Sequence, residues 1–162
     1  DILLMQLEIP LQTVEYAARK AFGKGVKVVL NPAPARSLPK ELFRHLYMVT
    51  PNRIEAEMLT GIKIANDADV EKVAEEICAM GVKNVIITLG SKGCLIREEG
   101  VSYRIVEPVD TTAAGDTFNG ALCVGLSEGM DLKQAAVMAS KASSIAVTRM
   151  GAQSSIPYRE EL

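Results

Sequence analysis

The sequence predicts an α/β fold, in which a mainly parallel sheet carries helices on both faces. Strand and helix patterns alternate over most of the 162 residues. The strands near residues 26–32 and 84–90 are strongly apolar, as in strands that are covered on both faces. Since there is no internal repeat, low-complexity tract or linker, residues 1–162 are expected to form one domain.

Strands are predicted where short apolar runs end at turn-forming residues. In chain order they cover residues 2–7, 26–32, 47–50, 84–88, 94–97 and 102–106. The last two are expected to form a hairpin around Glu98 to Gly100. Ligands bind at the carboxyl ends of such parallel strands. Polar segments with small residues follow several of these strands, so a binding site is expected there.

Helices are predicted from apolar residues at helical spacing and from residues that favour helix ends. In chain order they cover residues 11–22, 37–45, 53–59, 67–80, 116–129 and 132–147. The expected N-caps of three of these helices are Ser37, Asp67 and Asp131. Glycine at positions 23, 61 and 81 is expected to end the helices that precede it.

Composition limits the possible classes of function. Apolar residues make up 48%, charged residues 23%, and the net charge is −2, which is ordinary for a soluble globular protein. No basic block supports binding to nucleic acid or to a membrane surface. The apolar runs are strand-sized and shorter than the ~20 residues of a membrane helix.

The cysteine and histidine content argues against a metal cluster or a disulfide framework. Cys78, Cys94 and Cys123 are far apart in apolar sequence, which favours buried thiols in a reducing compartment. His45 is the only histidine, and an ordinary half-buried residue explains it better than catalysis does. A cytoplasmic protein is therefore expected.

Asp116 follows three small residues at the expected start of a helix. Ala113, Ala114 and Gly115 allow the backbone to approach a ligand, and the unpaired N–H groups of a helix start attract anions. A carboxylate beside a bound phosphate can take the proton of an attacking hydroxyl, as phosphoryl transfer to an alcohol requires. From these residues alone, the alternative is that Asp116 only caps the helix.

Two further segments contain possible ligand-binding groups. Thr88 to Gly93 reads TLGSKG, and its glycines permit a tight turn that either exposes backbone to a ligand or simply joins two strands. Asn52 and Glu55 lie three residues apart at an expected helix start. Glu55 can hold a hydrated Mg²⁺ ion there, and the alternative is a capping box with Asn52.

Familiar nucleotide-binding motifs are missing from the sequence. Gly115 and Gly120 have the glycine spacing of a P-loop, but Ala121 stands where that motif needs lysine. The G-x-G-x-x-G fingerprint of dinucleotide-binding proteins does not occur. Any nucleotide site in this chain is therefore of another kind.

Taken together, these segments resemble the ribokinase branch of the PfkB sugar kinases. DTTAAGDTFNGAL (residues 110–122) is similar to the signature of that family, and NPAPA, TPNRIEAE, TLGSKG and AVTRMGAQSSIP follow the order found there. The resemblance extends over residues 1–162 and implies the nucleotide-binding half of a ribokinase-like fold. It also implies ATP-dependent phosphorylation of the primary 5-hydroxyl of D-ribose.

The resemblance implies a role for each candidate site residue. Asp116 would be the general base, and backbone groups of Ala113, Ala114 and Gly115 would form an anion hole for the transferred phosphoryl group. Glu8 and Asp116 would contact the sugar. The residues implied to contact ATP are Asn52, Thr88, Leu89, Gly90, Ser91, Lys92, Gly93, Gly115, Asp116 and Ser140. At Ser140 a familiar member of the family has histidine.

Two cations are implied in the same way. Glu55 would hold Mg²⁺ through water. A monovalent cation, K⁺, would lie among groups that are mostly backbone carbonyls, contributed by Asp110, Thr112, Ala146, Arg149, Gly151 and Ser155.

Three features of the resembling family lie outside this sequence. They are the aspartate that grips the sugar, a Gly-Gly stretch in the sugar site, and a β-sheet lid that also mediates dimerisation. Because the chain begins at Asp1 within a strand pattern, we expect a fragment with little activity alone, from a protein that is a homodimer at full length. The alternatives are a PfkB kinase for another sugar or nucleoside, and a noncatalytic nucleotide-binding module.

Overall fold

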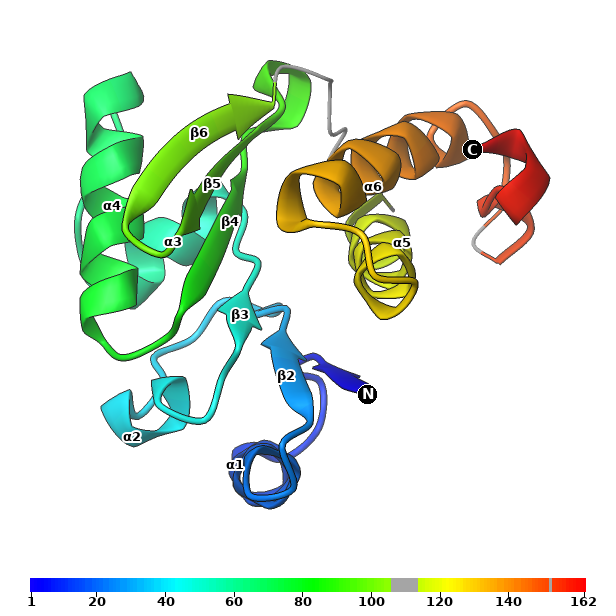
Figure 1. The fold of residues 1–162 in the computed structure, drawn as a ribbon. Helices are drawn as coiled ribbons and strands as arrows, with labels where there is room; N and C mark the ends of the chain where they lie inside the picture. Colours follow the sequence, from blue (N-terminus) through cyan, green and yellow to red (C-terminus); the bar gives the residue numbers. More distant parts are fainter. Residues whose placement is uncertain (106–113, 152) are drawn as a thin grey trace. The chain divides into compact units, whose positions relative to one another are not determined.

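Two compact units make up the structure, a computed structural model that describes residues 1–105, 114–151 and 153–162 (Figure 1). The first unit consists of Asp1–Thr88 with Leu95–Tyr103, and the second of Leu89–Cys94 with Arg104–Leu162. The expectation of a single domain over residues 1–162 stays a prediction. Among the described residues, no helix combines the length and the apolar character needed to cross a bilayer.

Six strands form one sheet in the order of the sequence. The first four, β1 (Ile2–Met5), β2 (Lys27–Leu30), β3 (Met48–Val49) and β4 (Asn84–Thr88), pair in parallel. The register places Leu3 opposite Val28 and Val49 opposite Val85. Val28, Val49 and Val85 are buried, as the near-continuous apolar runs predicted. The mainly parallel sheet is therefore confirmed.

The last two strands, β5 (Cys94–Glu98) and β6 (Val101–Ile105), are joined by only two residues. These residues, Glu99 and Gly100, have positive φ angles of 48° and 86°. Positive φ at both central positions is typical of the tight turns that match the twist of a hairpin. The predicted hairpin is present, and its turn is one residue shorter than the expected segment.

Helices connect the parallel strands of the first unit. They are α1 (Leu11–Phe22), α2 (Lys40–Phe43), α3 (Arg53–Thr60) and α4 (Asp67–Ala79). The bounds of α1 agree with the prediction, and Val14 and Ala18 are its buried residues. Gly61 ends α3 in the left-handed conformation, with φ of 74°.

Two predicted N-caps are wrong. Helix α2 begins after Pro39 without a side-chain cap, so Ser37 does not cap it. The cap of α4 is Asn66, whose side chain accepts hydrogen bonds from the N–H groups of Ala68 and Asp69. Asn66 has the extended backbone that an N-cap requires, so Asp67 becomes the first helical residue instead.

The second unit contains a pair of helices, α5 (Ala114–Ser127) and α6 (Leu132–Ala146). Asp131 caps α6 as predicted, because its side chain accepts a hydrogen bond of 2.7 Å from the N–H of Gln134. A Cβ atom on Gly125 of α5 would lie only 3.1 Å from the Cβ of Ala135 on α6. Small residues therefore allow these two helices to approach closely.

Short 3-10 turns complete the second unit: η1 (Gly90–Lys92), η2 (Gln153–Ser155) and η3 (Arg159–Glu161). Two ion pairs hold the C-terminal turn. Arg159 donates to Glu128 at 2.8 Å, and Arg149 donates to Glu161 at 3.2 Å. These pairs connect the last residues to the ends of α5 and α6.

Two helix-ending glycines should respond oppositely to alanine substitution. Gly61→Ala places a side chain at a φ of 74° and should cost about 1 kcal/mol of unfolding free energy. Gly23 has an ordinary helical φ of −64°, which alanine adopts without strain. Gly23→Ala should therefore stabilise the fold by about 0.5 kcal/mol, because alanine lowers the conformational entropy of the unfolded chain. Urea unfolding of both variants measures this, and equal effects at the two positions would contradict the assigned conformations.

Candidate functional site

Predicted ATP-binding residues meet where β3 and β4 end. Asn52 and Thr88 form a parallel β-bridge, and the N–H of Thr88 donates to the carbonyl of Pro51 at 3.0 Å. Both residues therefore stand at the carboxyl ends of neighbouring parallel strands. This is the edge of an α/β sheet at which ligands bind.

Asn52 and Glu55 form the capping box that the sequence offered as an alternative. The Asn52 side chain accepts from the N–H of Glu55 at 2.9 Å, and Glu55 Oε2 accepts from the N–H of Asn52 at 2.8 Å. Only 7% of Glu55 is exposed, and this burial raises the pKa of its carboxyl group against the opposing effect of the Asn52 hydrogen bond. The box uses Oε2, and among the described residues no group donates to Oε1.

This carboxylate fits a Mg²⁺ ion held through water. Among the residues that the structure describes, no three histidine, cysteine or acidic side chains gather in a possible metal site. Mg²⁺ keeps several waters and often uses only one or two protein carboxylates, so a single buried carboxylate with one oxygen available is compatible with it. The ion would supply positive charge next to the phosphates of a bound nucleotide.

Glu55→Gln should change how stability depends on pH. The pKa of Glu55 is raised above its ordinary 4.5, so the folded protein binds this proton more tightly than the unfolded chain does. Glu55 therefore lowers the unfolding free energy progressively as pH rises from below 4.5 through the raised pKa. Glutamine can still accept from the N–H of Asn52, so the variant should gain stability relative to the wild type as pH rises from 4.5 through the raised pKa.

Glu57 provides a matched control on the same helix. Hydrogen bonds from Lys63 and from the N–H of Ile64 lower the pKa of Glu57. Glu57→Gln should therefore lose stability relative to the wild type as pH rises from below the lowered pKa to 4.5, and this loss should stay constant at higher pH. Urea unfolding at several pH values measures both differences, and the same sign for the two variants would contradict the assigned environments.

The TLGSKG segment forms a compact turn after β4. The N–H of Leu89 donates to the carbonyl of Gly93 at 2.8 Å, and the N–H of Gly93 donates to that of Gly90 at 3.0 Å. Gly90 and Gly93 have φ of 63° and 79°, a conformation that other residues rarely adopt. The two glycines are therefore needed for this turn, and Ser91 and Lys92 are exposed on it.

Asp116 lies in the first turn of α5. Because the helix begins at Ala114, Asp116 is the third helical residue and not its N-cap. Its side chain is exposed, and Gly115 precedes it with open space where a side chain would be. The carboxylate thus lies in the first turn of a helix, and an anion site at this helix start stays a prediction.

Two features near Asp116 were missed by the sequence analysis. The buried side chain of Asn119 donates to the carbonyl of Gly115 at 2.8 Å and so braces the first turn of α5. A largely apolar cavity of about 240 Å³ lies beside Asp116, lined by Thr117, Val124, Met138 and other residues of the second unit. The spacing of Gly115 and Asn119, four apart, was the only signal for the first feature.

Glu8 and Ser140 differ in their accessibility. Glu8 is exposed just after Leu7, whose N–H donates to the carbonyl of Ala33 in the NPAPA segment at 2.8 Å. Ser140 is fully buried on α6, and its Oγ has no hydrogen-bond partner among the described residues. Contact of Glu8 with a sugar and of Ser140 with ATP stay predictions.

The residues implied to surround K⁺ are described only in part. Asp110 and Thr112 lie outside the described residues, as does Ala113 of the expected anion hole. The others fall in one segment: Ala146 ends α6, Arg149 donates its N–H to the Ala146 carbonyl at 3.2 Å, Gly151 has φ of 103°, and Ser155 is buried. Binding of a monovalent cation by these residues stays a prediction.

Cysteine chemistry has no support in the structure. Cys78, Cys94 and Cys123 are free thiols, of which Cys94 is buried as expected, whereas Cys78 and Cys123 are half-buried. Burial raises the pKa of Cys94 to about 12 and that of Cys123 to about 11, and it also raises the pKa of Cys78. Since the thiolate is the reactive form, these cysteines are poor nucleophiles near neutral pH.

Comparison with known protein families decides the assignment. The model of the pfkB family of carbohydrate kinases matches residues 3–159. The chain belongs to this family. Among curated pfkB-type relatives, the ribokinase of Haemophilus influenzae is 48% identical over 165 residues, covering 99% of this chain and 54% of that protein. The ribokinase of Staphylococcus aureus is 42% identical, and the match covers 100% of this chain and 55% of that protein.

Solved structures agree with this family assignment. The Arabidopsis thaliana ribokinase complexed with ribose and ATP superposes with a TM-score of 0.93 at 31% identity, covering 99% of this chain and 54% of that chain. The Thermotoga maritima ribokinase superposes with a TM-score of 0.87 at 44% identity, covering 99% of this chain and 55% of that chain. These matches confirm the predicted fold class, and the chain spans about half the length of the relatives it matches.

Proposed function

We propose that this chain is part of an ATP-dependent kinase that phosphorylates the 5-hydroxyl of D-ribose to give ribose 5-phosphate. The observation that carries the proposal is the position of Asp116 in the first turn of α5, within a chain of the pfkB family. The relatives in Haemophilus influenzae and Staphylococcus aureus are ribokinases, and the Arabidopsis thaliana structure contains ribose and ATP.

In this proposal the chain's own groups divide the work of phosphoryl transfer. Asp116 takes the proton of the ribose 5-hydroxyl group, and the oxygen of that hydroxyl group attacks the γ-phosphorus of ATP. The bond from that phosphorus to the β,γ-bridging oxygen breaks, and ADP leaves. Backbone groups of Ala113, Ala114 and Gly115 bind the negative charge on the transferred group.

The remaining residues bind the nucleotide and two cations. Asn52 and the segment from Thr88 to Gly93 contact ATP at the carboxyl end of β4. Glu55 would hold Mg²⁺ through water. K⁺ would lie, mostly among backbone carbonyls, between Asp110, Thr112, Ala146, Arg149, Gly151 and Ser155. Glu8 reaches the sugar. Support comes from the bridge between Asn52 and Thr88 and from the available Oε1 of the buried Glu55.

We further propose that other parts of such a protein complete the sugar pocket. The chain covers 54% of the Haemophilus influenzae ribokinase. Closure over a substrate excludes water in many kinases, and we assign this role to a lid outside these 162 residues. We propose that the same lid mediates dimerisation of the full-length protein, and that this protein is cytoplasmic. We therefore expect the isolated 162 residues to have little kinase activity.

A chimeric enzyme tests the proposal. In it, this chain replaces the matching residues of the Haemophilus influenzae ribokinase, which are 48% identical. ADP release is measured with D-ribose, 2-deoxy-D-ribose, D-fructose and adenosine as separate acceptors. The proposal predicts the highest kcat/KM with D-ribose, and a preference for any other acceptor would overturn the assignment to ribose.

Two alternative functions have specific tests. A deoxyribokinase of Salmonella typhi is 35% identical over 169 residues, which supports 2-deoxyribose as the second candidate acceptor. A noncatalytic nucleotide-binding module is tested on the chain itself by thermal shift with ATP, in the presence and absence of K⁺. A shift with ATP but no turnover in the chimera would favour the module, and no shift would count against both kinase and module.

A further inference from the structure

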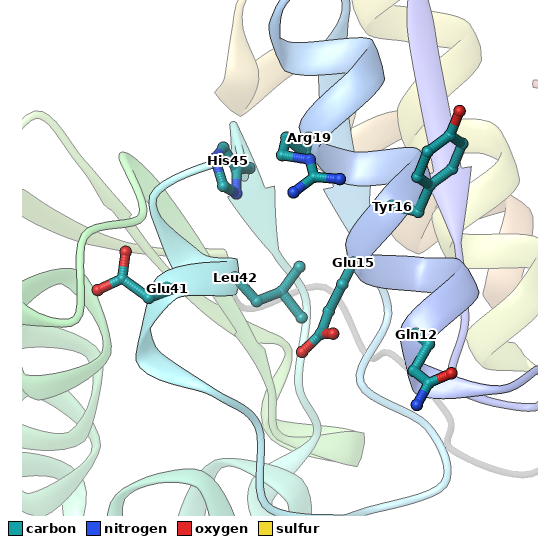
Figure 2. Close-up of a pocket in the computed structure, with 7 residues that line it drawn as sticks. All are labelled: Gln12, Glu15, Tyr16, Arg19, Glu41, Leu42 and His45. Atoms are coloured by element: carbon teal, nitrogen blue, oxygen red, sulfur yellow. The ribbon is translucent and has the colours of Figure 1, made fainter.

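A groove between α1 and α2 is lined by none of the predicted site residues (Figure 2). Its volume is about 390 Å³, within the range of pockets that hold small molecules. Its walls come from one side of α1 and from α2 with the turn that follows, all within the first unit. The proposed kinase reaction makes no use of this groove.

Two opposite charges on α1 face this groove without forming an ion pair. Glu15 and Arg19 are four residues apart, with the acid first, the order that favours an ion pair on a helix. Among the described residues, however, neither side chain has an ion-pair or hydrogen-bond partner. In contrast, Arg53 and Glu57 on α3 have the basic residue first, which is the less favourable order, and yet they form an ion pair with Arg53 Nε 3.6 Å from Glu57 Oε1.

Aromatic and apolar side chains provide the other surfaces of the groove. The Arg19 guanidinium carbon lies 6.0 Å from the centre of the Tyr16 ring, within range of a cation–π contact. His45 makes an edge-on contact with Phe22, with ring centres 5.5 Å apart, which holds the end of α1 to the turn after α2. Leu42 is a buried apolar residue of the groove, and Figure 2 shows the Glu15 side chain extending toward it.

The remaining acidic residue of the groove does not compete for the same ligand group. Glu41 accepts a hydrogen bond from Arg44 at 3.2 Å, and its carboxylate points away from the other labelled side chains in Figure 2. The groove therefore presents one available carboxylate, Glu15, and one available guanidinium, Arg19. An anion alone would satisfy only Arg19 and would be repelled by Glu15.

We propose that this groove binds a free α-amino acid with an apolar side chain. The ligand carboxylate accepts paired hydrogen bonds from the Arg19 guanidinium, and the ligand ammonium group donates to the Glu15 carboxylate. The ligand side chain lies in the groove against the Tyr16 ring, which is 56% exposed, whereas Leu42 is only 2% exposed and forms the floor. Such a zwitterion supplies both missing partners at once, which neither a simple anion nor a neutral molecule can do.

Calorimetric titration of the 162-residue chain with L-leucine tests this proposal. N-acetyl-leucine lacks the ammonium group and leucine methyl ester lacks the carboxylate, so each should bind about tenfold or more weakly. Glu15→Gln and Arg19→Gln should each weaken L-leucine binding by about the same factor. Lys24→Gln is the matched control, because Lys24 is an exposed cation just after α1 that does not line the groove.

The result that supports the proposal is binding of L-leucine that needs both ligand charges and both side chains. No binding at millimolar L-leucine would overturn it, as would equal binding to the wild type, Glu15→Gln and Arg19→Gln. Acetate binding as tightly as L-leucine would identify an anion site only and would also overturn it. None of these outcomes depends on kinase activity, so the proposed function is tested separately.

Discussion

Asp116→Asn should lower the turnover of the chimeric ribokinase by about 10²- to 10⁴-fold, the usual contribution of a general base. Asparagine keeps the shape of the side chain but cannot accept the proton of the sugar hydroxyl. Asp116 is exposed in the first turn of α5, so the substitution should leave the fold intact. ATP affinity, measured by titration calorimetry, should stay nearly unchanged.

Asp131→Asn is the matched control for this prediction. Asp131 is also an exposed aspartate at a helix start, and asparagine is an equally good N-cap, so neither stability nor turnover should change. Equal turnover of Asp116→Asn and wild type would remove Asp116 from the role of base. A parallel loss of ATP affinity would instead point to a role in nucleotide binding.

Phe118→Ala should lower the unfolding free energy of the chain by about 3–5 kcal/mol, as expected for truncating a buried aromatic residue. Phe118 is 1% exposed and lies two residues after Asp116 on α5. Its removal leaves a cavity under the turn that presents the predicted base. Equilibrium unfolding in urea, followed by circular dichroism, measures the loss.

Val124→Ala on the same helix separates this packing effect from a change in helix propensity. Val124 is 44% exposed, so its truncation should cost less than about 1 kcal/mol. A loss below 1 kcal/mol for Phe118→Ala, or equal losses for the two variants, would show that Phe118 does not anchor α5.

Strong local patterns made much of the fold predictable from the sequence. Helix α1 begins and ends where its apolar spacing and Gly23 indicated, and β4 is the buried apolar run that was expected. Asp131 and Gln134 form the capping box at the start of α6, as their sequence pattern favours. In each case the residues that decide the structure are within a few positions of one another.

The misses occurred where neighbouring residues compete or where distant segments meet. Asn66 and Asp67 are both good N-caps, and only the backbone conformation decides between them. The Asn52–Thr88 bridge and the groove of Glu15, Arg19 and His45 join segments that are far apart in the sequence. Local spacing carries no information about such contacts.

The candidate site was predicted chiefly through the combination of its segments. From local evidence, Asn52 and Glu55 were a capping box, and the structure contains that box. The same Glu55 is buried with one carboxylate oxygen available, so capping and a role toward Mg²⁺ are compatible. Asp116 lies within the first turn of α5, and this removes the N-cap as the explanation for it.

The most direct test of the proposed function is the position of the phosphate on the product. The chimera is incubated with ATP, Mg²⁺, K⁺ and D-ribose, and the purified product is examined by ³¹P and ¹³C NMR. Phosphorus coupling to carbon 5 of ribose is the predicted result, with no product from the Asp116→Asn variant on the same timescale. Unmodified ribose, or phosphate on any other hydroxyl, would contradict a kinase that uses Asp116 to activate the 5-hydroxyl.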